Sequence, residues 1–106
     1  MYKFTVLYYR VDDELAQEDF FSGTHLPLLE GLPGLRAVEV SRVLGQPMGQ
    51  SRFVLTVEAY FDNQPALEAA LMTATGVGLM NALRPWADAR LIAWYYADSF
   101  STDQTP

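Results

Sequence analysis

The chain has 106 residues, half of them hydrophobic, and its formal net charge is −6 with a pI near 4.5. This length fits one domain with one hydrophobic core. Lys3 is the only lysine and the arginines are scattered, so the chain lacks the basic cluster that binds nucleic acids or anionic membranes.

The absence of cysteine excludes disulfides, zinc–thiolate centres, iron–sulfur clusters and cysteine nucleophiles. Lys3, Arg10 and Asp12 interrupt the apolar residues at the N-terminus, so we predict no signal peptide there. No apolar run approaches transmembrane length. We therefore expect a cytoplasmic protein that binds neither nucleic acid nor a membrane.

The first predicted strand covers residues 2–9, which are mostly aromatic and β-branched. Both of its faces are apolar, which is typical of a strand at the centre of a sheet. A helix follows, with Asp12 as its expected cap and Ala16, Phe20 and Thr24 on one face. Pro27 is expected to fray or kink this helix around His25, with a short turn continuing to residue 30.

Two further strands are predicted over residues 35–44 and 52–61, joined by the loop 45–50. In the second of them, the odd positions from 53 to 61 are apolar, while Arg52, Glu58 and Tyr60 share the opposite face. That opposite face is expected to point away from the helices.

A second helix is expected after Asp62 and Asn63, both capping candidates, with Pro65 in its first turn. Gly76 and Gly78 are expected to interrupt it, leaving a short helical piece over about 79–83. A fourth strand is predicted over 89–97. We assign residues 1–97 to one domain and 98–106 to a flexible tail.

The element order is β-α-β-β-α-β, which predicts an α+β, ferredoxin-like fold with a four-stranded antiparallel sheet. Both helices would cover one face of that sheet. Because the strands carry large apolar residues on both faces, the other face would be a sizeable apolar patch. A second copy of the same sheet would cover it, so we expect a homodimer with a barrel-like arrangement and a cavity for a ligand.

Two motifs resemble those of a known family. The stretch Phe20-Phe21-x-x-Thr24-His25-x-Pro27-Leu28, followed by Leu32-Pro33-Gly34-Leu35-Arg36, is similar to the EthD family of the dimeric α+β barrel superfamily. The resemblance extends over nearly the whole chain, including Gly76 and the segment 80–86. It implies a dimeric α+β barrel and a link to bacterial breakdown of ethyl tert-butyl ether. Relatives of the same architecture include cofactor-independent monooxygenases, muconolactone isomerase and haem-handling enzymes.

The chain departs from the family pattern at two positions. Family members often have Tyr or Trp four residues before the histidine, where this chain has Phe21, and a bulky residue eight before it, where this chain has Gln17. A role that needs a hydroxyl or an indole N–H at position 21 is therefore not expected here.

His25 is the only histidine and the first candidate for catalysis. A neutral imidazole in a cavity can act as an acid or a base, and a helix C-terminus would raise its pKa. The alternative is a structural histidine that satisfies the backbone carbonyls left free by Pro27.

Glu58 and Tyr60 are the other catalytic candidates, because a carboxylate enclosed in a barrel is a candidate base or anchor. The alternatives for Glu58 are a salt bridge to Arg52 or to a partner subunit, or a position on a face that is simply open to water. Phe21, Arg52, Trp86 and Trp94 are the residues expected to bind substrate, the alternative for the aromatic ones being core or dimer packing. One histidine without a supporting signature does not indicate haem or another metal, so we predict no cofactor and no metal.

Two functions remain open from the sequence. In the first, a homodimer binds a small apolar organic compound and takes part in its degradation or oxidation, by acid/base, isomerase or cofactor-free monooxygenase chemistry. His25 would be the acid/base there, and Glu58 or Tyr60 would orient the substrate. In the second, the chain is a non-catalytic binding or accessory protein that serves a partner oxidase.

Overall fold

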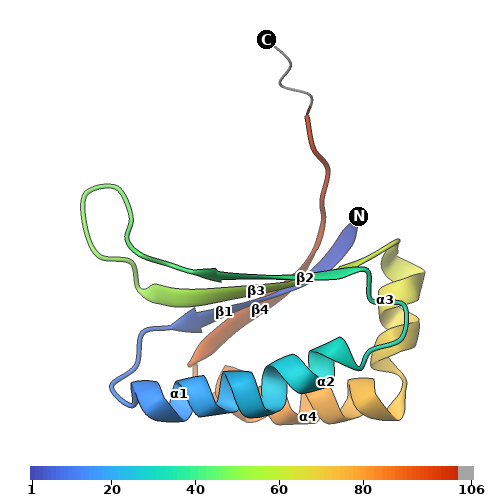
Figure 1. The fold of residues 1–106 in the computed structure, drawn as a ribbon, viewed down its shortest axis with the longest axis horizontal. Helices are drawn as coiled ribbons and strands as arrows, with labels where there is room; N and C mark the ends of the chain where they lie inside the picture. Colours follow the sequence, from blue (N-terminus) through green and yellow to red (C-terminus); the bar gives the residue numbers. More distant parts are fainter. Residues whose placement is uncertain (103–106) are drawn as a thin grey trace.

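The structure is a computed structural model that describes residues 1–102. Four strands form one antiparallel sheet in the order β2-β3-β1-β4, and the helices all cover one of its faces (Figure 1). The strands are β1 (Tyr2–Tyr9), β2 (Ala37–Arg42), β3 (Phe53–Phe61) and β4 (Ile92–Asp98). The predicted ferredoxin-like arrangement is therefore confirmed.

The hydrophobic core lies between the sheet and the helices. Strand β1 is central, as its two apolar faces predict, and pairs with β3 on one side and β4 on the other. Its even-numbered residues Phe4, Val6 and Tyr8 point into the core and are at most 3% exposed. The odd-numbered residues of β3 from Leu55 to Phe61 are equally buried, which confirms the expected alternation over that range. Phe53 departs from it, because a register shift makes it the partner of Tyr9.

The first helical segment runs without a break from α1 (Glu14–Phe20) through η1 (Phe21–His25) to α2 (Leu26–Glu30). The expected kink is a π-helical turn instead, in which the Leu26 N–H bonds to the Phe21 carbonyl. This turn directly precedes Pro27, which has no N–H and crowds the carbonyl of an ordinary α-turn. Asp13, and not Asp12, caps the helix, since its Oδ1 accepts a hydrogen bond from the Ala16 N–H.

The buried face of this helical segment differs from the expected one. Gln17, Phe21 and His25 are at most 7% exposed and face the sheet, whereas Ala16 and Thr24 do not form the buried stripe. The Gln17 side chain is held there because its amide donates to the Tyr9 carbonyl at 2.8 Å. A polar residue, Gln17, thus lies on the buried face of the helix, although hydrophobic spacing alone predicts a different buried face.

Helices α3 (Gln64–Leu71) and α4 (Ala74–Asp88) follow β3. Asn63 caps α3, as expected. The expected interruption at Gly76 and Gly78 is wrong, because the chain breaks earlier, at Met72 and Thr73, and α4 then continues through both glycines and Pro85. Thr73 caps α4 by accepting from the Gly76 N–H. Gly76 lies against the end of α3, where a Cβ atom would be 2.3 Å from the Ala70 carbonyl oxygen, so the glycine permits this close approach.

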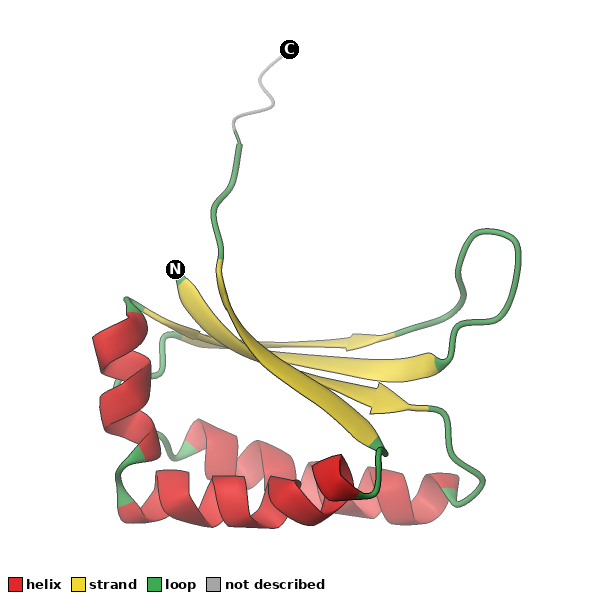
Figure 2. Ribbon diagram, turned by 180° about the vertical axis from the view of Figure 1, so that it is seen from behind, coloured by secondary structure: helices red, strands yellow, loops and turns green. Residues whose placement is uncertain are grey.

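The second face of the sheet has no helix over it (Figure 2). The residues that point to this face are those of odd number in β1, β2 and β4 and of even number in β3 from Thr56 onwards, among them Lys3, Thr5, Leu7, Tyr9, Thr56, Glu58, Tyr60, Ala93 and Tyr95. We call it the open face. At its centre Thr5 is 1% exposed, and its hydroxyl has no hydrogen-bond partner within the described residues.

The last strand and the expected C-terminal tail differ from their predicted boundaries. Strand β4 starts at Ile92, later than the expected residue 89, and ends at Asp98, so the first residue of the expected tail belongs to the sheet. Residues 103–106 of that tail lie outside the described part.

Within residues 1–102 no single helix is long and apolar enough to cross a bilayer, and α3 with α4 reaches that length and composition only as a pair bent by 83°.

Candidate functional site

The structure joins His25 to a tyrosine on the central strand. The Tyr8 hydroxyl lies 2.6 Å from His25 Nδ1, and both side chains are 0% exposed. His25 comes from the π-helical turn η1 and Tyr8 from the core face of β1, so the contact links the first helical segment to the middle of the sheet. We refer to these two residues as the Tyr8–His25 pair.

The other ring nitrogen of His25 has no partner. Nε2 is fully buried and makes no hydrogen bond within the described residues. Buried polar atoms are nearly always hydrogen-bonded, and an unpaired one calls for a physical explanation. The unpaired Nε2 is therefore the feature of this site that most directly indicates a binding position for a polar group of a ligand.

Counting the hydrogen-bond donors and acceptors of the pair shows which tautomer of His25 is favoured. If Tyr8 donates to Nδ1, the ring proton is on Nε2 and a single N–H is left without an acceptor. If Nδ1–H donates to Tyr8, the phenol proton and the Nε2 lone pair are both left unpaired. Each unpaired buried group is unfavourable, so we assign the first arrangement, with Nε2–H as a free donor.

Burial keeps both members of the pair neutral. It lowers the pKa of His25 to about 4, and it raises the pKa of the Tyr8 phenol far above its ordinary value. The expectation that the helix end would raise the His25 pKa is wrong, because the loss of solvation outweighs any favourable effect of nearby carbonyls. At neutral pH the pair therefore holds an uncharged imidazole and an uncharged phenol.

Three further aromatic rings surround the pair. Phe21 meets Tyr8 and His25 edge-on at 6.1 and 5.9 Å between ring centroids, and it is 5% exposed. Phe20 lies 6.5 Å from His25, and Trp86 of α4 lies 6.1 Å from Tyr8. Phe20 and Trp86 stack on each other at 4.5 Å, and both are only half-buried. Two of the predicted substrate-binding residues thus lie beside the pair, Phe21 against both members and Trp86 against Tyr8.

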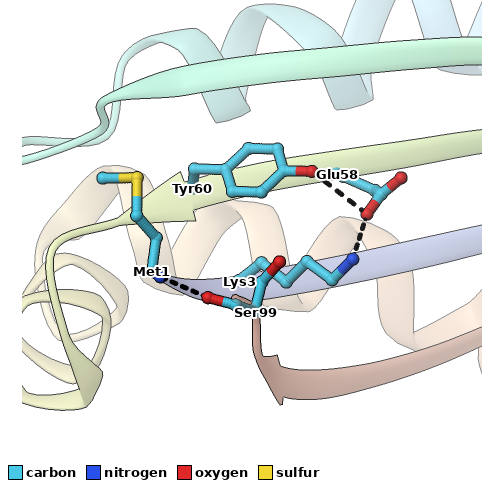
Figure 3. A network of polar contacts seen from close by, with 5 residues as sticks. All are labelled: Met1, Lys3, Glu58, Tyr60 and Ser99. Atoms are coloured by element: carbon cyan, nitrogen blue, oxygen red, sulfur yellow. Dashed lines mark hydrogen bonds and ion pairs between the residues drawn. The ribbon is translucent and has the colours of Figure 1, made fainter. Parts of the chain in front are cut away.

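Glu58 and Tyr60 lie on the opposite side of the sheet from His25, on the open face, as their strand positions predict. Glu58 forms an ion pair with Lys3 and accepts a hydrogen bond from the Tyr60 hydroxyl at 3.3 Å (Figure 3). The partner of Glu58 within the described residues is therefore Lys3 and not Arg52. Because the sheet separates them, His25 and Glu58 or Tyr60 do not share a site within one subunit.

Arg52 and Trp94 are also away from the pair. Arg52 lies at the end of the loop before β3 and lines a surface pocket with Arg10 and Gln46. Trp94 is on the core face of β4, half-buried, with its ring 6.3 Å from that of Phe4. The structure therefore places these two predicted substrate-binding residues in separate parts of the protein.

A second surface pocket, of about 450 Å³, lies beside α1. Its lining includes Gln17 and Leu55, and Leu55 is the β3 residue that pairs with Tyr8. Phe21 follows Gln17 by one turn of helix and is itself buried. The pocket is therefore lined by the strand partner of Tyr8 and by the residue one helical turn before Phe21. Neither Tyr8 nor His25 lines it.

Within residues 1–102, no group of three or more His, Cys, Asp or Glu side chains is arranged to hold a metal ion. Sequence reasoning did not identify Tyr8 as the partner of His25. Its alternate position in the first strand places it on the same face as Phe4 and Val6, but nothing in the sequence pairs position 8 with position 25. Only the docking of the first helical segment on β1 brings them together.

Comparison with solved structures identifies close architectural relatives. An EthD family protein from Bacillus halodurans is 32% identical in sequence, with a TM-score of 0.86 over 94% of this chain and 99% of its own. A Dabb family protein from Mesorhizobium loti is 13% identical, with a TM-score of 0.67 over 94% of this chain and 97% of its own. A dimeric ferredoxin-like protein of unknown function from Bacteroides fragilis is 17% identical, with a TM-score of 0.59 over 92% and 95%. Comparisons with protein-family models and with curated proteins found no match.

Proposed function

Since this chain belongs to the EthD family, we propose that it binds a small, largely apolar organic compound beside the Tyr8–His25 pair and takes part in its degradation or oxidation. The observation that carries this proposal is the unpaired, fully buried Nε2 of His25, held among aromatic rings. Apolar walls with one placed polar group are typical of sites for small organic ligands.

The chemistry follows from the state of the pair. Nε2–H donates a hydrogen bond to an oxygen atom of the bound compound, and this withdraws electron density from the adjoining carbon. Tyr8 holds the imidazole in the tautomer that keeps Nε2 protonated. Removal of a proton from the carbon next to a carbonyl begins many isomerisations and cofactor-free oxygenations, and it is easier when the carbonyl oxygen accepts such a hydrogen bond. His25 is therefore the proposed catalytic residue, and Phe21 and Trp86 are proposed to line the site.

We also propose that the protein is a homodimer that pairs through the open face. Leu7, Tyr9 and Tyr95 supply apolar area there, and a bare sheet face of this kind favours association. The dimeric state of the Bacteroides fragilis protein of similar fold supports this arrangement. The network of Lys3, Glu58 and Tyr60 would then lie at the subunit interface, as would any role of Glu58 and Tyr60.

One observation favours a second function. Tyr8 and His25 are both closed to solvent, so neither group of the pair is presented at the surface. This fits a non-catalytic binding or accessory protein that holds its ligand for a partner oxidase. The first function remains our main proposal, because a carrier for an apolar ligand has no need of a buried donor without a partner.

The test is a turnover screen of small aromatic and ether compounds with the wild type, Tyr8→Phe and His25→Leu. Tyr60→Phe is the matched control, since it removes the same hydroxyl from the other side of the sheet. We expect turnover to fall by about 100-fold or more in His25→Leu and to persist in Tyr60→Phe. Unchanged turnover in a folded His25→Leu would remove His25 from catalysis, and binding by native mass spectrometry without any turnover would support the carrier function.

A further inference from the structure

The two half-buried rings of the site are its outermost part. Phe20 and Trp86 belong to different helices, α1 and α4, and each touches one member of the buried pair. Phe21, which touches both members, is 5% exposed and fixed in the core. Of the rings around the pair, Phe20 and Trp86 are therefore the two that solvent reaches.

The contacts of Trp86 permit its ring to accept a new neighbour. Within the described residues its indole N–H makes no hydrogen bond, so the ring is held by aromatic contacts alone. Trp86 is also in the last turn of α4, directly after Pro85, whose missing N–H removes one hydrogen bond from that turn. A change of ring packing here breaks no polar contact of the side chain.

The place of the Phe20 ring has the properties of a ligand site. A flat ring in that place would stack on Trp86, as Phe20 does at 4.5 Å. The Phe20 ring is a neighbour of the imidazole, with 6.5 Å between the two ring centroids. A ligand ring in this place would lie beside His25, and an acceptor oxygen on it is the kind of partner that Nε2–H lacks within the described residues.

We propose that a planar aromatic compound with an acceptor oxygen displaces the Phe20 ring, stacks on Trp86 and accepts a hydrogen bond from His25 Nε2. This rests on the proposed function, for which it names the ligand class and the access route. Phe20 acts as a gate that fills the site while it is empty. The ligand must be flat because it takes the place of a ring in a stack, and it must carry an acceptor because Nε2 is a donor.

The experiment uses 1-indanone as the probe and indane, which has the same rings without the oxygen, as its comparison. In a Trp94→Phe background Trp86 is the only tryptophan, so its fluorescence reports the stack. Titration calorimetry on the same proteins measures binding independently of fluorescence. Phe20→Ala vacates the proposed site, Phe20→Leu keeps an apolar side chain without a flat ring, and Phe100→Ala is the control at a phenylalanine that is 86% exposed.

We expect Phe20→Ala to bind 1-indanone about tenfold more tightly than the parent, with quenching of Trp86, while Phe100→Ala leaves the affinity unchanged. The preference for 1-indanone over indane should also be about tenfold, and His25→Leu should abolish it. A gain of affinity on truncation is not a result of mere destabilisation. Phe20→Leu should fall between the parent and Phe20→Ala.

Binding seen by calorimetry without a change in Trp86 fluorescence would overturn the inference. So would an affinity that Phe20→Ala and Phe20→Leu leave unchanged or reduce in proteins that remain folded. Gln17→Trp fills the neighbouring pocket beside α1, so loss of binding in that variant would move the route there and leave the proposed function standing. If instead 1-indanone binds as expected and the turnover screen finds no substrate, the catalytic proposal fails and the inference stands.

Discussion

The Tyr8 hydroxyl and His25 Nδ1 lie 2.6 Å apart at the contact between the central strand and the first helical segment, where neither side chain is exposed. Tyr8→Phe removes the hydroxyl and leaves Nδ1 unpaired, and we expect a loss of about 1–3 kcal/mol in the free energy of unfolding. A double-mutant cycle with His25→Leu, measured by urea unfolding, should give a coupling energy of about 1 kcal/mol. A coupling near zero would mean that the contact adds nothing to stability.

The pH dependence of stability should reflect the buried imidazole. Its pKa is lowered to about 4 in the folded protein from an ordinary value of 6.5, so the unfolded chain binds the extra proton between these values. Stability is therefore fully present above pH 6.5 and is lost as the pH falls from 6.5 towards 4, by about 3 kcal/mol in total.

The measurement compares urea unfolding of the wild type and His25→Leu at several pH values from 4 to 7. The difference between them should shrink towards acid, because the variant has no imidazole to protonate. Since His25 is the only histidine, its ring-proton NMR signal gives the pKa directly. A midpoint at or above 6.5 in the folded protein would contradict the burial argument.

Gly76 and Gly78, two residues apart in α4, should respond in opposite directions to alanine. A Cβ atom at Gly76 would be 2.3 Å from the Ala70 carbonyl oxygen and 2.5 Å from the Leu71 Cα atom, both on the backbone of α3. Gly76→Ala should therefore destabilise the protein by more than about 3 kcal/mol. At Gly78 the nearest atom is Leu28 Cδ2 at 4.0 Å, and Gly78→Ala should stabilise the helix by about 0.5–1 kcal/mol. Thermal unfolding of the two variants checks both signs, and equal effects would refute the close approach of α3 and α4.

The open face should determine the oligomeric state. Tyr95 points to it from β4 and is 47% exposed, so Tyr95→Glu places a charge in the proposed interface. We expect the wild type to sediment at about twice its chain mass of 11.9 kDa and Tyr95→Glu to shift towards one chain mass. Leu15→Glu, at a residue of α1 that is 72% exposed, should stay dimeric. A wild type that is a monomer at micromolar concentration would sink the dimer proposal.

Much of the fold was predictable because local patterns carry it. The alternation in β3 placed Leu55 and Val57 on the core face and Glu58 on the other, and the two apolar faces of residues 2–9 indicated the central strand. Residues 62–65 also marked the start of α3 correctly. The helix interiors were predicted less well. Gly76 was expected to interrupt a helix, as its low helix propensity suggests, but it lies inside α4 where α3 packs closely against it.

The candidate site was likewise predictable only in part from the sequence. Sequence alone determined that one histidine exists, that it lies two positions before Pro27 where an irregular helix is expected, and that Phe21 precedes it by one turn. Tertiary structure alone decided that the partner of His25 is Tyr8, that Glu58 and Tyr60 lie beyond the sheet, and that Nε2 is unpaired. The reason is physical: alternation and periodicity give the face on which a side chain lies, but the contact between two faces and the loss of water that lowers the His25 pKa arise only when the helix docks on the sheet.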